Sequence, residues 1–194
     1  MEMTVESTSK TGSPQANSPE KSKPKRIHVV GKKNSGKTTL VCELVTHLTQ
    51  RGFSVATIKH THHNHELDTT GKDSWQHRQA GASSVGILAA EMTAVFLPVS
   101  RSKNEIERYA SLETALSGCD LILVEGDLHC GAPKLEVWRP ATSSNPYAAT
   151  MTGINFVVTD DPLPNQNQLK TGLPLLPRAN LQQIADTVLK LAGR

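Results

Sequence analysis

The segment GKKNSGKT, residues 31–38, combines glycines, a lysine and a hydroxyl side chain at the spacing of a phosphate-binding loop. Gly31 and Gly36 allow the backbone to turn so that its N–H groups point inward, and Lys37 can place an ammonium group beside the β- and γ-phosphates of a nucleotide. The Thr38 hydroxyl can ligate Mg²⁺. The predicted nucleotide contacts in this loop are Gly31, Asn34, Ser35, Gly36, Lys37, Thr38 and Thr39.

A site of this kind needs an acidic residue from a neighbouring strand, and the run DLILVEG, residues 120–126, supplies one. The carboxyl ends of parallel strands share one edge of a sheet, so we expect Glu125 beside Thr38, directly or through a metal-bound water. Asp120 lies at the opposite end of this strand and is interpreted as a polar residue at the strand start. The sequence therefore predicts that Thr38 and Glu125 serve Mg²⁺.

Four of the eight histidines fall within residues 60–65, with Asp68 close behind. In the interpretation that we rank first, Lys59 and His60 reach the nucleotide and Asp68 reaches Mg²⁺, because the preceding strand ends near the phosphate loop. Contact with a partner or substrate ranks second. A transition-metal site ranks third, because metal ligands usually converge from two places or at helical spacing.

The segment Thr159–Pro162 follows an apolar strand and offers two interpretations. Asp160 could place its carboxylate against the N1–H and N2–H donors of guanine, which adenine lacks. Formation of a turn by Asp-Asp-Pro explains the same residues without a ligand. Both interpretations stay open at this point.

The hydrophobic periodicity predicts strands that alternate with helices, which is typical of an α/β domain with a mainly parallel sheet flanked by helices. The predicted strands are residues 27–30, 54–59, 85–88, 94–97, 121–124 and 154–158. The predicted helices begin after the phosphate loop, near Asp73 or Ser74, at a capping box on Asn104, and at a cap on Asn180. Residues 139–153 are expected to form a surface loop.

Residues 1–25 are expected to be a disordered tail, and residues 26–194 a single nucleotide-binding domain. The tail has no Leu, Ile or aromatic residue, so it cannot bury enough apolar surface to offset the entropy of ordering. The net charge of the chain is only +3, and its aromatic residues are two Trp, two Tyr and three Phe. This composition argues against binding to a nucleic acid polymer.

The sequence contains no apolar stretch long enough to span a bilayer and no apolar core of a secretion signal, so we expect a cytoplasmic protein that does not act at a membrane. The three cysteines are widely spaced, which favours reduced thiols. Cys42 and Cys119 fall within apolar patterns and are predicted to be small core residues.

Several segments together resemble one family, the MobB proteins, which are molybdopterin-guanine dinucleotide biosynthesis adapter proteins. The resemblance extends from Ile27 to about Pro162. It is carried by the phosphate loop with Val29 and Val30, by IKHTHH at 58–63, by Asp68, by GKDS at 71–74, by RQAGA at 78–82, by DLILVEG at 120–126 and by PKLEVWR at 133–139.

The resemblance implies a P-loop fold of the dethiobiotin-synthetase-like branch and a cytosolic GTP-binding protein with slow GTPase activity. It implies an expected homodimer that assists the guanylyltransferase attaching GMP to molybdopterin, with molybdopterin itself as a further candidate ligand. It also implies that GTP and Mg²⁺ are the cofactors. On the same resemblance, a conserved-motif surface beside the nucleotide is formed by His60, His62, His63, Asp68, Lys72, Asp73 and Arg78.

The chain departs from the family pattern after Glu125 and Gly126, where Asp127 and Leu128 replace the usual aromatic residue and lysine. Glu66 stands where an aspartate is usual. Lys32 is interpreted as a solvated lysine. Arg78 and Arg139 are the candidates for a cation that stabilises the transferred phosphate.

Two functions of other classes stay open on the sequence. A metal-delivery GTPase for nickel or zinc would use the histidine-rich segment, including His62, His63 and His65. A ligase that forms a phosphorylated intermediate is supported only by the Val-Glu-Gly end of the strand at 121–124.

Overall fold

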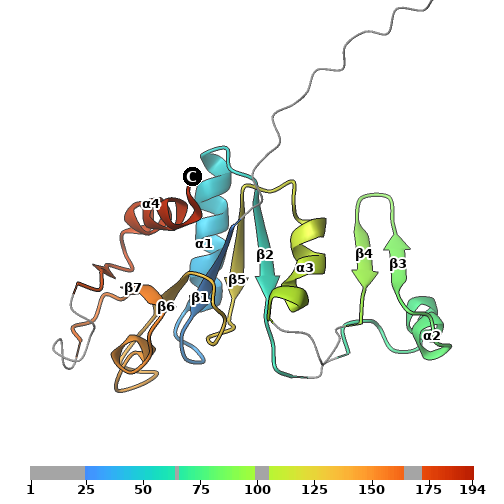
Figure 1. The fold of residues 1–194 in the computed structure, drawn as a ribbon, viewed down its shortest axis with the longest axis horizontal. Helices are drawn as coiled ribbons and strands as arrows, with labels where there is room; N and C mark the ends of the chain where they lie inside the picture. Colours follow the sequence, from blue (N-terminus) through green and yellow to red (C-terminus); the bar gives the residue numbers. More distant parts are fainter. Residues whose placement is uncertain (1–24, 64–65, 99–104, 164–171) are drawn as a thin grey trace, which may run out of the picture.

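The computed structural model describes residues 25–63, 66–98, 105–163 and 172–194. The predicted tail lies outside these residues except for Lys25, which starts the first strand, and so does the predicted cap Asn104. In chain order the elements are β1 Lys25–Val30, α1 Lys37–Gln50, β2 Val55–Lys59, α2 Asp73–Gln79, β3 Val85–Leu88, β4 Thr93–Phe96, α3 Glu105–Ala115, β5 Leu121–Glu125, β6 Lys134–Val137, η1 Tyr147–Ala149, β7 Ile154–Val158, β8 Leu175–Leu176 and α4 Leu181–Ala192 (Figure 1).

Six parallel strands form the main sheet in the order β2-β5-β1-β6-β7-β8. Glu125 of β5 is in register with Val29 of β1 on one side and with Lys59 of β2 on the other. All the carboxyl ends therefore meet at one edge of the sheet, where the loop after β1 begins.

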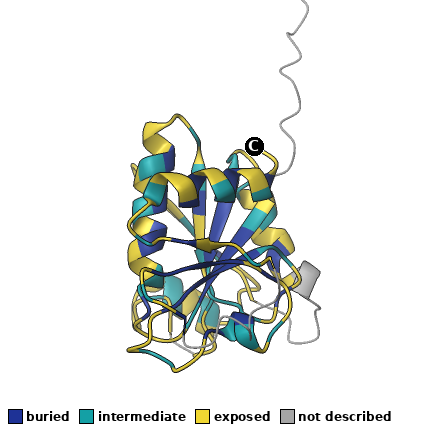
Figure 2. Ribbon diagram, turned by 90° about the vertical axis from the view of Figure 1, so that its left-hand side faces the viewer, coloured by how far each residue is buried: buried dark blue, intermediate teal, exposed yellow. Residues whose placement is uncertain are grey.

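One face of the sheet is covered by α1 and α4. Ile27 and Val29 of β1 and Leu121 and Leu123 of β5 pack there against the apolar faces of both helices. Figure 2 shows the buried residues concentrated in the strands and in the inward sides of these helices. The core therefore fixes the start of α1 next to the end of β1.

The opposite face is covered by two different segments. Tyr109 of α3 packs on Ile122 and Val124 of β5, the side chains that alternate with those facing α1. Trp138 and the η1 region cover β6 and β7. Residues 139–153, which were predicted to form a surface loop, therefore cover this face of the sheet. They include the short 3-10 helix η1.

A separate antiparallel hairpin is formed by β3 and β4, and it projects with α2 beyond the β2 end of the main sheet (Figure 1). Val85 is buried on the side that contacts α2. The hairpin also carries some of the most exposed large apolar side chains of the described residues, including Leu88, Met92 and Val95.

The predicted α/β class is confirmed, with departures at two strands and one cysteine. The strands β6 and β8 were not predicted. Cys42, expected in the core, is exposed, because the buried side of α1 consists of Leu40, Val41, Leu44 and Leu48. In the described residues, no helix combines the length and the apolar character that crossing a membrane requires.

Candidate nucleotide-binding site

The loop between β1 and α1 has the backbone conformation of a phosphate cradle. Gly31, Asn34 and Gly36 all have positive φ angles, of 144°, 65° and 98°. At Gly31 a Cβ atom would lie 2.3 Å from the carbonyl oxygen of Val137 and 2.7 Å from Ser35 Oγ. Only glycine fits there, because the loop passes directly over the end of β6.

Lys37 begins α1, and its side chain folds back over the loop. Its Nζ donates to the carbonyl oxygen of Lys32 at 2.7 Å. Burial lowers the pKa of the Lys37 ammonium, while the nearby Glu125 carboxylate acts in the opposite direction. A partly buried ammonium held over inward-facing N–H groups favours an anion at this position.

Thr38 and Glu125 come together as predicted, since Thr38 Oγ1 donates to Glu125 Oε1 at 2.9 Å. The hydroxyl comes from the first turn of α1 and the carboxylate from the last residue of β5. Two hard oxygen donors adjacent to a phosphate cradle are the ligand type that Mg²⁺ prefers. Thr38 and Glu125 therefore fit that ion.

The remaining predicted loop residues differ in exposure. Ser35 is fully buried, and its Oγ has no hydrogen-bond partner among the described residues. Asn34 and Thr39 are exposed on the outer side of the loop. These positions agree with a cradle that faces outward, and contact of each residue with a nucleotide stays a prediction.

Lys59 is the last residue of β2 and His60 follows it, and the two side chains have different surroundings. Lys59 lies with Thr38 and Glu125 along a groove between α1 and β2, where Cys42 also lines the wall. The His60 amide donates to the Glu125 carbonyl at 2.9 Å, but its ring is mostly buried and accepts from Arg108 at 3.0 Å. Lys59 is thus placed to reach a ligand at Glu125, whereas the His60 ring has protein partners.

Asp68 is held by residues around α2. Its Oδ1 accepts from Ser74 Oγ at 2.9 Å and from the Thr69 amide at 2.8 Å, and its Oδ2 lies 3.7 Å from Arg78 Nε. These contacts explain a structural role for the carboxylate. Its predicted contact with Mg²⁺ stays a prediction.

The histidine-rich segment does not converge on one point in its described part. The His60 and His62 rings meet edge-on at 4.7 Å between centroids, and the His63 amide donates to Thr61 Oγ1. His65 lies outside the described residues. Among the described residues, the group of side chains with metal-binding geometry is formed elsewhere.

A second cleft lies at the ends of β6 and β7, on the other side of the phosphate loop. It is lined by Val137, Trp138, Arg139, Val158, Thr159, Asp160, Asp161 and Arg178. Asp160 Oδ1 accepts from the Ala179 amide at 3.1 Å, so this carboxylate joins the ends of β7 and β8. The Arg139 guanidinium comes within 3.5 Å of the Cβ position at Gly36.

Two interactions next to the cradle were missed by the sequence analysis. The Lys32 ammonium lies 4.5 Å from the centroid of the Tyr147 ring, so this exposed lysine is stacked on the η1 segment. Glu136 is buried and accepts from the amides of Tyr147 and Ala148 at 2.7 and 2.9 Å. Burial raises the pKa of Glu136, and the two amides act against that rise. The spacing of Lys134 and Glu136 was the only sequence signal for this arrangement.

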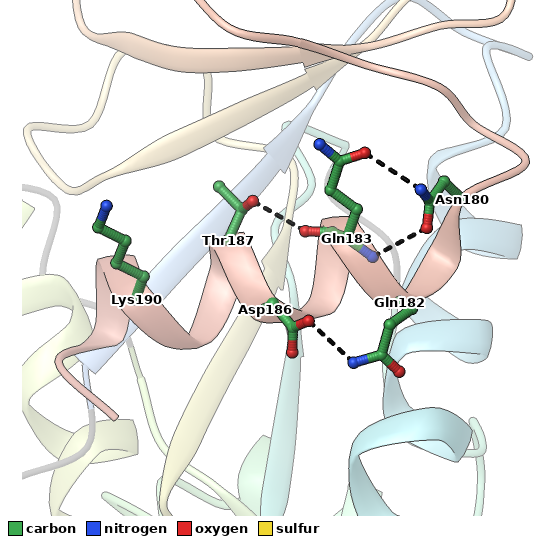
Figure 3. Close-up of a pocket in the computed structure, with 6 residues that line it drawn as sticks. All are labelled: Asn180, Gln182, Gln183, Asp186, Thr187 and Lys190. Carbon is green, nitrogen blue, oxygen red and sulfur yellow. Dashed lines mark hydrogen bonds between the residues drawn. The ribbon is translucent and has the colours of Figure 1, made fainter.

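The polar face of α4 forms a shallow concave surface that includes none of the predicted site residues (Figure 3). Its side chains mainly bond to one another. Asn180 caps the helix by accepting from the Gln183 amide at 3.1 Å, and Gln182 donates to Asp186 at 2.8 Å. The predicted cap on Asn180 is therefore confirmed, and we assign no ligand to this surface.

Comparison with known sequences gives a consistent result. The family model described as MobB, molybdopterin guanine dinucleotide synthesis protein B, matches residues 26–160. A molybdopterin-guanine dinucleotide biosynthesis adapter protein of Escherichia coli is 31% identical over 157 residues, which cover 80% of this chain and 86% of that protein. A protein of the same name from Haemophilus influenzae is 39% identical over 118 residues, or 58% of this chain, and the match spans 62% of its length.

Solved structures agree on the fold. A crystal structure titled molybdopterin-guanine biosynthesis protein B is 27% identical with a TM-score of 0.64, and the match covers 87% of this chain and 99% of that one. The MobB structure from Bacillus subtilis is 23% identical with a TM-score of 0.63, covering 87% of this chain and 98% of that one. These neighbours and the parallel sheet confirm the predicted P-loop fold.

Proposed function

The chain belongs to the MobB family, and from this premise we propose that it is a GTP-binding adapter in the biosynthesis of molybdopterin guanine dinucleotide. The observation that carries the proposal is the hydrogen bond between Thr38 Oγ1 and Glu125 Oε1, 2.9 Å long, beside the phosphate loop. It joins the two parts that a nucleotide site needs: a cradle for phosphates and an acid for the cation.

The triphosphate of GTP is the ligand group that this cradle fits. Backbone N–H groups and the start of α1 supply partial positive charge, and Lys37 supplies a full one. Thr38 and Glu125 would hold Mg²⁺, which neutralises charge on the phosphates when it is bound. Lys37 would exchange its bond to the Lys32 carbonyl for bonds to phosphate oxygens.

The guanine base would occupy the cleft at the ends of β6 and β7. This cleft adjoins the phosphate loop through Val137 and Arg139, and it presents the carboxylates of Asp160 and Asp161. The Asp160 bond to the Ala179 amide supports the turn interpretation and leaves room for a second contact by the same carboxylate. The preference for guanine itself rests on the family.

Hydrolysis by the isolated chain would be slow. Of the two candidate cations, Arg78 is paired with Glu66 and lies 5.3 Å from the Phe96 ring centroid, on the α2 side of the molecule. Arg139 is adjacent to Gly36 and is the better placed of the two. A partner that orders Arg139 or adds its own cation would complete the site.

Two protein contacts belong to the proposal. The first is with the molybdopterin guanylyltransferase, with molybdopterin as a further candidate ligand, in the cytoplasm. The second is with another copy of this chain, through the exposed face of the β3–β4 hairpin. Leu88 and Val95 share that face by strand alternation, and they are 86% and 57% exposed.

Association with the guanylyltransferase tests the adapter role. We expect the purified chain to bind that enzyme more tightly with GTP and Mg²⁺ than with GDP or without nucleotide. Thr38→Ala removes the hydroxyl next to Glu125 and should abolish the nucleotide dependence. Thr46→Ala, on the same helix, should preserve it. Equal or absent association in all nucleotide states would contradict the proposal.

A further inference from the structure

A second group of ligand-type side chains lies on the face of the sheet opposite α1. His28 comes from β1, whereas Asp127 and Cys130 come from the segment after β5. One donor atom from each residue lies within 4.8 Å of the other two. Nitrogen, oxygen and sulfur donors thus converge from two separate parts of the chain.

The His28 ring is oriented by the backbone. It is 0% exposed, and its Nδ1 lies 3.1 Å from the Gly126 carbonyl oxygen. Because a carbonyl oxygen can only accept, Nδ1 carries the proton of this bond, which leaves Nε2 as the ring nitrogen that can face a ligand. Nε2 has no hydrogen-bond partner among the described residues. Metal-binding histidines are commonly oriented by such a carbonyl.

The other two side chains are also held in place. Asp127 Oδ2 accepts from the Tyr109 hydroxyl at 2.7 Å and lies 4.0 Å from His60 Nε2. Cys130 is buried, and its carbonyl oxygen accepts from the Lys134 ammonium, which also donates to Ala132. Lys134 therefore holds the backbone of the segment that carries Cys130.

We propose that His28, Asp127 and Cys130 bind one divalent cation of the zinc class, with water as the fourth ligand. Imidazole, thiolate and carboxylate together suit Zn²⁺, whereas Mg²⁺ prefers oxygen donors alone. Binding forms a metal–sulfur bond and releases the thiol proton of Cys130 to solvent. The thiolate and the carboxylate then balance the two positive charges of the ion.

This site is distinct from the proposed nucleotide site and does not depend on it. Asp127 stands where the family commonly has an aromatic residue, so the donor set reflects a departure of this chain from the family pattern. An ion there would tie β1 to the segment that follows Glu125. Three positive charges lie nearby, on Arg26, Arg108 and Lys134. The Arg26 guanidinium stacks on Tyr109, and the Arg108 guanidinium contacts His60.

Metal binding by the purified full chain tests the proposal. After chelator treatment and desalting, the chain should take up one equivalent of Zn²⁺ by elemental analysis. Co²⁺ should give a thiolate-to-metal charge-transfer band. Cys130→Ser should remove that band and weaken Zn²⁺ binding by more than about 100-fold, since losses at supporting residues alone reach that range. Cys42→Ser, at an exposed cysteine, should behave like the wild type.

A double variant separates this cluster from the histidine-rich segment. His62→Gln with His63→Gln should bind Zn²⁺ like the wild type. The proposal is overturned if the wild type retains no Zn²⁺ or Co²⁺ after desalting, if the cobalt band persists in Cys130→Ser, or if the double variant loses the metal. If Cys130→Ser does not fold, Asp127→Asn replaces it: this variant removes the carboxylate ligand and should weaken Zn²⁺ binding, and an unchanged Zn²⁺ affinity would overturn the proposal. GTP affinity, measured separately, tests the proposed function and should not change in Cys130→Ser.

Discussion

At the scale of single residues, the phosphate loop depends on the absence of a side chain at Gly31. Its φ of 144° and the 2.3 Å approach of a Cβ to the Val137 carbonyl leave no room for alanine. We expect Gly31→Ala to lower the free energy of unfolding by about 2 kcal/mol or more and to abolish nucleotide binding. Urea unfolding and a GTP titration measure the two effects.

Gly52→Ala is the matched control for this substitution. Gly52 also has a positive φ, of 88°, but a Cβ there meets nothing within 4 Å. The Gly52→Ala substitution should lower the free energy of unfolding by only about 1 kcal/mol, the usual penalty for a left-handed backbone conformation. If both variants lose the same stability and both bind GTP, the close approach to β6 does not matter.

If the Asp160 carboxylate accepts hydrogen bonds from guanine, the preference of the chain for GTP over ATP depends on this residue. In that case Asp160→Ala should reduce the ratio of GTP to ATP affinity by roughly 10- to 100-fold, the value of hydrogen bonds to a charged group. Asp161→Ala, which changes the neighbouring carboxylate of the same cleft, serves as the comparison. An unchanged ratio in Asp160→Ala would leave Asp160 with its bond to the Ala179 amide only.

The sequence was sufficient to predict residues that belong to a short motif or to a strand end. It was not sufficient to predict side-chain contacts between segments that are distant in the chain. The loop motif identified Gly31, Lys37 and Thr38, and the strand-end argument placed Glu125 beside Thr38, as observed. Nothing in the order of residues indicated that the His60 ring would face Arg108. That contact joins two distant segments, β2 and α3, and depends on packing.

At the scale of elements, α4 is attached to α1 by both apolar and polar contacts. Asp186 accepts from Arg51 at 2.8 Å. It also accepts from Gln182 at 2.8 Å (Figure 3). The Gln182 hydrogen bond and then the Arg51 guanidinium hold the pKa of Asp186 below its ordinary value of 3.8. A lowered carboxyl pKa means that the ionised form is favoured by folding.

The stability from Asp186 is therefore present above pH 3.8 and is lost as the pH falls through the lower value of the folded state. We expect Asp186→Asn to lose stability less steeply than the wild type over this acid range in urea unfolding. Thr187→Ala, on the same polar face, removes no charge and should follow the wild-type slope. Equal slopes for all three proteins would exclude this contribution.

Elements with regular apolar patterns were predictable, and those without them were not. The strand β5 is apolar at four successive positions and was identified. The strand β6 reads Lys-Leu-Glu-Val, yet all four residues are buried. Its charged side chains are satisfied by backbone groups, Lys134 by carbonyls and Glu136 by amides. Such partners are set by the loop that covers β6, so the sequence pattern alone suggests a surface segment.

At the scale of the whole molecule, most of the exposed large apolar side chains among the described residues lie in the hairpin or directly beside it. Its Phe96 side contacts Arg78 of α2, but the side with Leu88 and Val95 has no cover in the described residues. We expect the wild type to sediment as a dimer and Leu88→Lys to shift it to a monomer. Leu175→Lys, at the other end of the main sheet, should remain dimeric. A monomeric wild type would contradict the proposed role of the hairpin.

The charge of the molecule is distributed with a clear local bias. The described domain is nearly neutral, but Lys32, Lys33 and Lys37 gather in one loop, opposite Glu125. Of these lysines, Lys32 is stacked on Tyr147 and Lys37 folds over the cradle. The positive charge is thus concentrated where a triphosphate would bind.

The affinity for GTP in the presence of Mg²⁺, measured by titration calorimetry on the wild type and on Lys37→Ala, tests this account most directly. Lys33→Ala is the matched control, because Lys33 is an exposed lysine of the same loop. We predict one GTP per chain for the wild type, an affinity reduced by at least about 100-fold in Lys37→Ala, and a change below about fivefold in Lys33→Ala. A wild type that binds no GTP, or a Lys37→Ala variant with unchanged affinity, would contradict the account.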